Sequence, residues 1–170
     1  MYAVRRHYER ATQELASGSP LSINELSPPL VVVPIEDWSK VTKKAVRFAL
    51  TLSREVLVLQ VRTEDQEDDL RQKWPALVEE PARRARLPAP QLIVVNSPYR
   101  YVITPVVDYV LDLERKHPDR DIAVAVPDLV EKHWYEYFLH KQHGELLTAL
   151  LLLKGHQRIY IVNVPWHLRA

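Results

Sequence analysis

Five short apolar runs, separated by segments of helical length, are the feature that most constrains how this chain folds. The runs cover residues 30–33, 56–61, 92–95, 122–126 and 158–164. Each is short and nearly continuous, which is typical of strands buried on both faces of a parallel sheet. Because strands that alternate with helices favour right-handed parallel crossovers, the sequence predicts an α/β fold with a five-stranded, mainly parallel sheet.

The segments between the runs carry helix signals. We expect helices over residues 37–53, 64–81, 101–116 and 134–154. Asp37 or Ser39 can cap the first of them. The second is expected to stop near Pro81, and the third accommodates Pro105 only if that residue lies in the first turn.

The chain is expected to divide into two parts. Residues 1–29 are predicted to form a polar, partly basic helix and a linker, and residues 30–170 to form one α/β domain. A domain of this size is long enough to bury a sizeable core. Whether Met1 is a natural start is left open.

Composition argues against several classes of function. Twenty-three Lys and Arg balance 22 Asp and Glu, so the whole chain has no broad attraction for DNA, RNA or an acidic membrane, although local patches stay open. The absence of cysteine excludes disulfides and thiolate chemistry. Three glycines against 13 prolines argue against a glycine-rich phosphate loop. The longest strongly apolar stretch, residues 146–153, is shorter than the roughly 20 residues of a spanning helix, so the chain is expected to be soluble.

Several motifs share an order and spacing with a known family. His140-Lys141-Gln142-His143 lies on the last predicted helix, Pro165-Trp166-His167-Leu168 closes the last strand, and Ser97-Pro98-Tyr99-Arg100 follows the third strand. Together they resemble the C-terminal cytosolic domain of bacterial permeases of the amino-acid/polyamine/organocation (APC) superfamily. That family usually has asparagine at the position of Lys141.

The resemblance implies a universal-stress-protein-like fold with strand order 3-2-1-4-5. It also implies a non-catalytic regulatory or dimerisation domain at the cytoplasmic face of the cell membrane, attached to the embedded part of an amino acid or cation permease. No cofactor is implied. Related potassium-importing permeases bind cyclic di-AMP with this domain, so that nucleotide is a possible ligand. A free-standing universal-stress-like protein that binds a small nucleotide or metabolite is the alternative.

Nucleotide-binding members of the universal-stress-protein family follow the fourth strand with a glycine-rich loop. Here Pro127 and Asp128 follow it instead, and the first glycine after the fourth strand is Gly144. We therefore do not expect ATP binding of the usual kind.

Six residues are candidates for ligand contact: Glu36, Asp37, Ser97, Arg100, Asp128 and Trp134. In the fold that the chain resembles, the ligand site lies at the carboxyl ends of the first and fourth strands. A guanidinium at Arg100 can hold a phosphate or carboxylate, or it can form an internal ion pair or a contact with a partner subunit. Glu36 and Asp37 can bind a ribose or a cation, or Asp37 can cap a helix. Trp134 can stack on a purine, or it can belong to the core or an interface.

No set of residues in the sequence indicates a particular reaction or a metal site. His140 and His143 lie three residues apart on one predicted helix, and His133 lies two turns earlier in the sequence. No further ligand from elsewhere and no H-E-x-x-H signature accompany them. Ser97 lies outside any G-x-S-x-G elbow. We expect no enzyme activity and no metal.

A homodimer is expected from the apolar character of the last helix and the last strand. A helix that is apolar around much of its circumference needs cover on more than one side, and an apolar edge strand pairs readily with another copy. The residues expected at this interface are Leu147, Leu150, Leu151, Ile159, Ile161 and Val162.

Overall fold

The computed structural model describes residues 18–21, 23, 26–63, 70–97, 103–130, 147, 149–151 and 158–167. Five strands form one sheet, and every neighbouring pair is parallel. The strands are β1 (Leu30–Ile35), β2 (Val56–Thr63), β3 (Gln91–Ser97), β4 (Ile122–Val130) and β5 (Ile159–His167). Their order across the sheet is β3-β2-β1-β4-β5, which confirms the predicted fold class.

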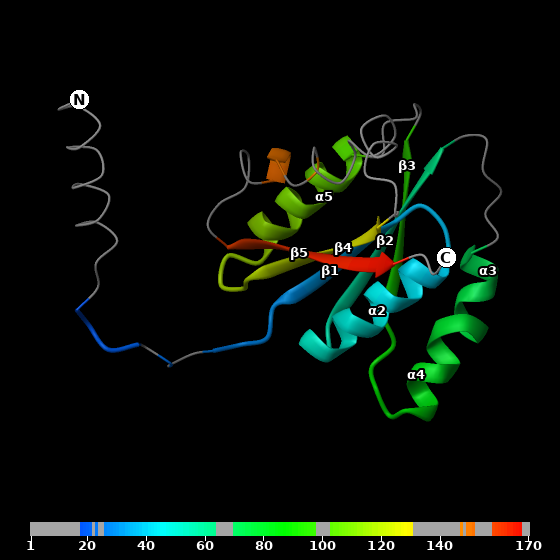
Figure 1. The fold of residues 1–170 in the computed structure, drawn as a ribbon, viewed down its shortest axis with the longest axis horizontal. Coiled ribbons are helices and arrows are strands. Elements are labelled where there is room, and N and C mark those ends of the chain that lie inside the picture. Colours follow the sequence, from blue (N-terminus) through cyan, green and yellow to red (C-terminus); the bar gives the residue numbers. More distant parts are fainter. Residues whose placement is uncertain are drawn as a thin grey trace.

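Helices cover both faces of this sheet (Figure 1). They are α2 (Lys40–Leu52), α3 (Leu70–Trp74), the π-helix η1 (Pro75–Glu79), α4 (Glu80–Arg84) and α5 (Ile103–Lys116). Residues 147 and 149–151 are also helical. No helix within the described part of the chain is long and apolar enough to cross a membrane.

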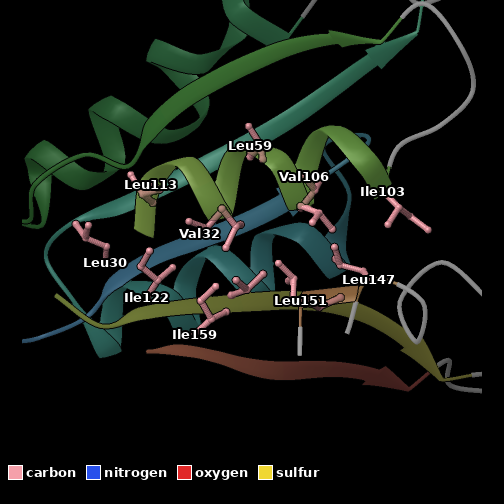
Figure 2. Close-up of a cluster of buried hydrophobic side chains, with 14 of the residues drawn as sticks. Leu30, Val32, Leu59, Ile103, Val106, Leu113, Ile122, Leu147, Leu151 and Ile159 are labelled. Atoms are coloured by element: carbon pink, nitrogen blue, oxygen red, sulfur yellow. The ribbon is translucent and has the colours of Figure 1, made fainter. Parts of the chain in front are cut away.

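The strand residues alternate between two cores, because successive side chains in a strand point to opposite faces. On one face, Leu30 and Val32 of β1 pack with α5 and with Leu147 and Leu151 (Figure 2). On the other face, Val31 and Val33 pack with α2, α3 and η1. Both faces are apolar, which explains why the sequence shows continuous runs rather than alternation.

Helix α2 begins at a side-chain cap. The hydroxyl of Ser39 accepts a hydrogen bond from the backbone N–H of Thr42 at 3.3 Å. Of the two predicted caps, Ser39 is therefore the one used. The buried face of α2 carries small residues, including Ala45 and Ala49, which let the helix pack closely on Ala123 and Ala125 of β4.

The predicted end of the second helix near Pro81 is wrong, because α4 continues to Arg84. A π-helical turn precedes it, in which the N–H of Glu80 bonds to the carbonyl of Pro75. A proline in an α-helix clashes with the carbonyl four residues earlier. The wider turn directly before Pro81 accommodates its ring, so helical structure continues through this proline to Arg84. Pro105, as predicted, lies in the first turn of α5.

The prediction placed the last two strands too short. β4 extends through Pro127 to Val130, and β5 extends through Pro165 to His167. The helix expected near the start of residues 1–29, and most of the helix expected over residues 134–154, lie outside the described residues.

Candidate functional site

The strands β1 and β4 lie side by side in the sheet. The chain goes from β1 to β2 on one side of this pair, and from β4 to β5 on the other side. Over the described residues their ladder ends at the pair Val32–Val124. The ladder between β4 and β5 continues to Val130–His167, and the ladder between β1 and β2 to Ile35–Gln60. In open α/β sheets, such a switch point at the carboxyl ends of the strands is the usual place of a ligand crevice.

Two predicted site residues, Glu36 and Asp37, follow β1 at this switch point, and both are exposed. Their backbone carbonyls hold the turn together. Gln60 donates to the carbonyl of Glu36 at 3.4 Å, and the hydroxyl of Thr42 donates to that of Asp37 at 3.0 Å. Because Ser39 caps α2, the carboxylate of Asp37 is not the helix cap.

Two buried polar atoms adjoin the same turn. The indole N–H of Trp38 and the side-chain carbonyl oxygen of Gln60 have no hydrogen-bond partner among the described residues. Trp38 packs edge-on against Trp74, with ring centroids 5.4 Å apart. Buried polar groups are nearly always paired in folded proteins, so these two atoms are exceptions next to the switch point.

Asp128 and Ser97 reach the carboxyl edge on the α5 face of the sheet. Asp128 follows Val124 and Val126 of that core at every second position of β4. Ser97 follows Ile93 and Val95 in the same way on β3, so each shares the face of those residues. Asp128 is half-buried, whereas Ser97 is only 5% exposed. Because β2 and β1 lie between their strands, the sheet does not place these two side chains next to each other. Arg100 and Trp134 lie outside the described residues.

A basic groove on α2 was missed in the sequence reasoning. The groove has a volume of about 500 Å³ and joins α2 to β5; it is lined by Lys40, Lys43, Lys44, Arg47, Phe48, Thr51 and Trp166. Lys44 donates to the carbonyl of Pro165, and its ammonium lies 5.9 Å from the centroid of the Trp166 ring. The signal was present in the sequence, because cations at 40, 43, 44 and 47 fall on one helical face.

The described residues contain no group of three or more His, Cys, Asp or Glu side chains that could hold a metal ion. His133, His140 and His143 lie outside the described residues.

The six residues predicted at a dimer interface divide into two sets. Leu147, Leu151 and Ile159 are buried in the core of this chain itself, under α5 (Figure 2). Leu150, Ile161 and Val162 are half-buried. β5 forms one edge of the sheet, as predicted. The three half-buried side chains are therefore the members of the set that a second copy could still cover.

Comparison with known proteins adds three findings. The model of the KimA potassium transporter C-terminal domain family matches residues 27–166. The Potassium transporter KimA of Bacillus subtilis (strain 168) is 24% identical over 173 residues, which cover 99% of this chain and 26% of that protein. A weaker structural likeness, with a TM-score of 0.38 and 16% identity, relates 82% of this chain to 99% of the universal stress protein UspA from Lactobacillus plantarum.

This chain thus spans about a quarter of the length of its curated relative. The family match covers β1 to β4, β5 as far as Trp166, and the switch point between β1 and β4. The chain belongs to the KimA potassium transporter C-terminal domain family.

Proposed function

We propose that this chain is the cytosolic regulatory domain of a potassium transporter. The match of residues 27–166 to a transporter domain family is the observation that carries the proposal. The resemblance to permeases of the APC superfamily allowed an amino acid or a cation as the transported substrate. The relative that aligns with 99% of the chain bears the name of a potassium transporter, which favours the cation.

The domain acts without catalysing a reaction. It binds a ligand or a second copy of itself with different affinity in different states of the transporter, and this difference biases transport. A ligand that binds both states equally well shifts nothing.

The proposed ligand is a nucleotide, with cyclic di-AMP as the first candidate. Support comes from the switch point, where Glu36 and Asp37 present exposed carboxylates beside the unpaired polar atoms of Trp38 and Gln60. Carboxylates accept hydrogen bonds from ribose hydroxyls and from the adenine amino group. Arg100, which follows Ser97 by three residues, would supply the cation for a phosphate.

The domain is proposed to form a homodimer through its β5 edge. Ile161 and Val162 are half-buried on this strand, and an edge strand presents unpaired backbone groups to a second copy. Sedimentation of the purified chain at micromolar concentration tests this proposal. A dimer is expected, and a monomer would contradict it.

The nucleotide proposal is tested by thermal denaturation of the purified chain with cyclic di-AMP, with AMP as the comparison. At a ligand concentration a hundred times Kd, binding to the folded state adds about 2.7 kcal/mol of stability. We expect a rise in Tm with cyclic di-AMP that Arg100→Ala abolishes and that Arg115→Ala, on the surface of α5, leaves intact. An equal response to AMP, or none to either nucleotide, would reject cyclic di-AMP.

The transport proposal is tested in cells that lack their own potassium uptake. The complete open reading frame that encodes this chain is expected to restore growth at low external potassium. Failure to restore growth, together with uptake of an amino acid by the same protein, would overturn it.

A further inference from the structure

The four cations of the α2 groove form a single positive face. Lys40, Lys43, Lys44 and Arg47 are all exposed, and α2 carries no carboxylate along its whole length. None of the ion pairs among the described residues involves them. At 1.5 Å of rise per residue, the row from Lys40 to Arg47 is about 10 Å long.

This arrangement is unfavourable for the helix itself. Like charges three and four residues apart repel one another. Cations in the first turn also oppose the positive end of the helix dipole, where Asp or Glu is favoured. The chain as a whole has a formal charge of only +1, so the concentration of positive charge here is local. An external anion would relieve both penalties.

The helices around α2 do not share its excess of cations to the same degree. The segment from α3 to α4 packs on the same face of the sheet and has four cations against two carboxylates (Figure 1). On the opposite face, α5 has three carboxylates against two cations. Five carboxylates at residues 64–69 directly precede α3, so the excess of cations is particular to α2.

Aromatic side chains flank the cations. Trp166 and Phe48 line the groove and are half-buried, and the ammonium of Lys43 lies 5.9 Å from the ring centroid of Trp38. Tryptophan is enriched where a protein meets the headgroup region of a bilayer, since its ring is apolar and its N–H is polar. Clusters of four or more Lys and Arg on one helix face are typical of surfaces that bind anionic lipids.

We propose that this basic face of α2 docks on the anionic phospholipid headgroups of the membrane that holds the parent transporter. The inference rests on the proposed function, which places the domain next to that membrane. Docking would hold the domain at a fixed orientation to the bilayer. The strength of this contact would then depend on the lipid charge and the ionic strength.

The test is co-sedimentation of the purified chain with vesicles of phosphatidylcholine alone and with vesicles that also contain phosphatidylglycerol. We expect binding only to the anionic vesicles, and release by added salt. A cation near an anionic surface contributes about fivefold in affinity, so Lys40→Gln with Arg47→Gln should weaken binding by about 25-fold.

The matched control is Arg115→Gln with Lys116→Gln, which removes the same charge from two exposed residues of α5. This pair should leave vesicle binding within about twofold of the unchanged chain, because those side chains lie on the other face of the sheet. Circular dichroism of each variant establishes that it is folded.

Three outcomes would overturn the proposal. One is no binding to the anionic vesicles, and another is equal loss in the α2 and α5 variants. The third is binding of a poly-glutamate peptide, but not of vesicles, with the same dependence on α2, which would assign the groove to an acidic protein segment. Failure here with potassium-dependent growth intact would reject only the docking surface.

Discussion

The guanidinium of Arg158 lies 3.7 Å from the carboxylate of Glu114, whose side chain is only 2% exposed. The same guanidinium donates to the backbone carbonyls of His117 at 2.8 Å and Arg120 at 3.2 Å. Arg158 therefore joins the start of β5 to the end of α5. A cation at this place also complements the negative end of the helix dipole.

Arg158→Ala is expected to lower the free energy of unfolding by about 3 kcal/mol, because it leaves the Glu114 carboxylate buried without this cation. Urea denaturation measures the loss. The double variant Arg158→Met, Glu114→Met should recover most of it, since a buried ion pair can be replaced by apolar side chains at little cost. A loss below about 0.5 kcal/mol in the single variant, typical of an exposed site, would contradict this role.

Ser39→Ala is expected to lower the free energy of unfolding by about 1 kcal/mol, because it removes the acceptor that caps the N–H of Thr42. Thermal denaturation measures the change. Ser39→Asp is the control, since aspartate keeps an acceptor and its charge suits a helix N-terminus. Equal destabilisation by both variants would show that the cap is not what matters at this position.

Lys40→Glu should raise the stability of the fold while it weakens vesicle binding. Lys40 is the first residue of α2, and a carboxylate there interacts favourably with the helix dipole by about 0.3–1 kcal/mol. Chemical denaturation and vesicle co-sedimentation on the same protein preparation give both values. A variant that is less stable than the unchanged chain, or one that binds anionic vesicles equally well, would contradict the proposal that Lys40 is present for membrane binding rather than for stability.

The pKa of Asp112 is expected to lie below its ordinary value of 3.8, because Lys116 donates a hydrogen bond to its carboxylate. A lowered pKa means that the ion pair stabilises the fold above pH 3.8, and that this contribution is lost as the pH falls through the pKa of the folded state. An NMR titration of the Asp112 carboxyl carbon measures this pKa. Lys116→Gln should raise it toward 3.8, and Arg115→Gln should raise it less; the reverse order would contradict the assignment.

The existence and order of the strands could be predicted because each is buried on both faces and so appears as an apolar run. The ends of β1, β4 and β5 could not, because prolines were taken as stops. Pro34 lies in β1 and Pro127 in β4, both just beyond the last β1–β4 pair, Val32–Val124. A proline is tolerated in a strand where no ladder bond is needed from its nitrogen.

Prediction of the site was less complete. The carboxyl end of β1 could be foreseen from topology, and Glu36 and Asp37 do lie there. Which face Ser97 and Asp128 reach depends on the register of β3 and β4, which an apolar run alone does not fix. The α2 groove was missed because a formal charge of +1 hides a local cluster, and Trp166 joins it only through the pairing of β5 with β4.

The most direct test of the regulatory role is the initial rate of potassium uptake by the complete transporter in vesicles, with and without cyclic di-AMP. It is compared between the intact protein and a protein that lacks residues 27–166. The nucleotide is expected to change the rate of the intact protein and to leave the truncated protein unaffected. Identical rates in all four conditions would contradict a regulatory role for this domain.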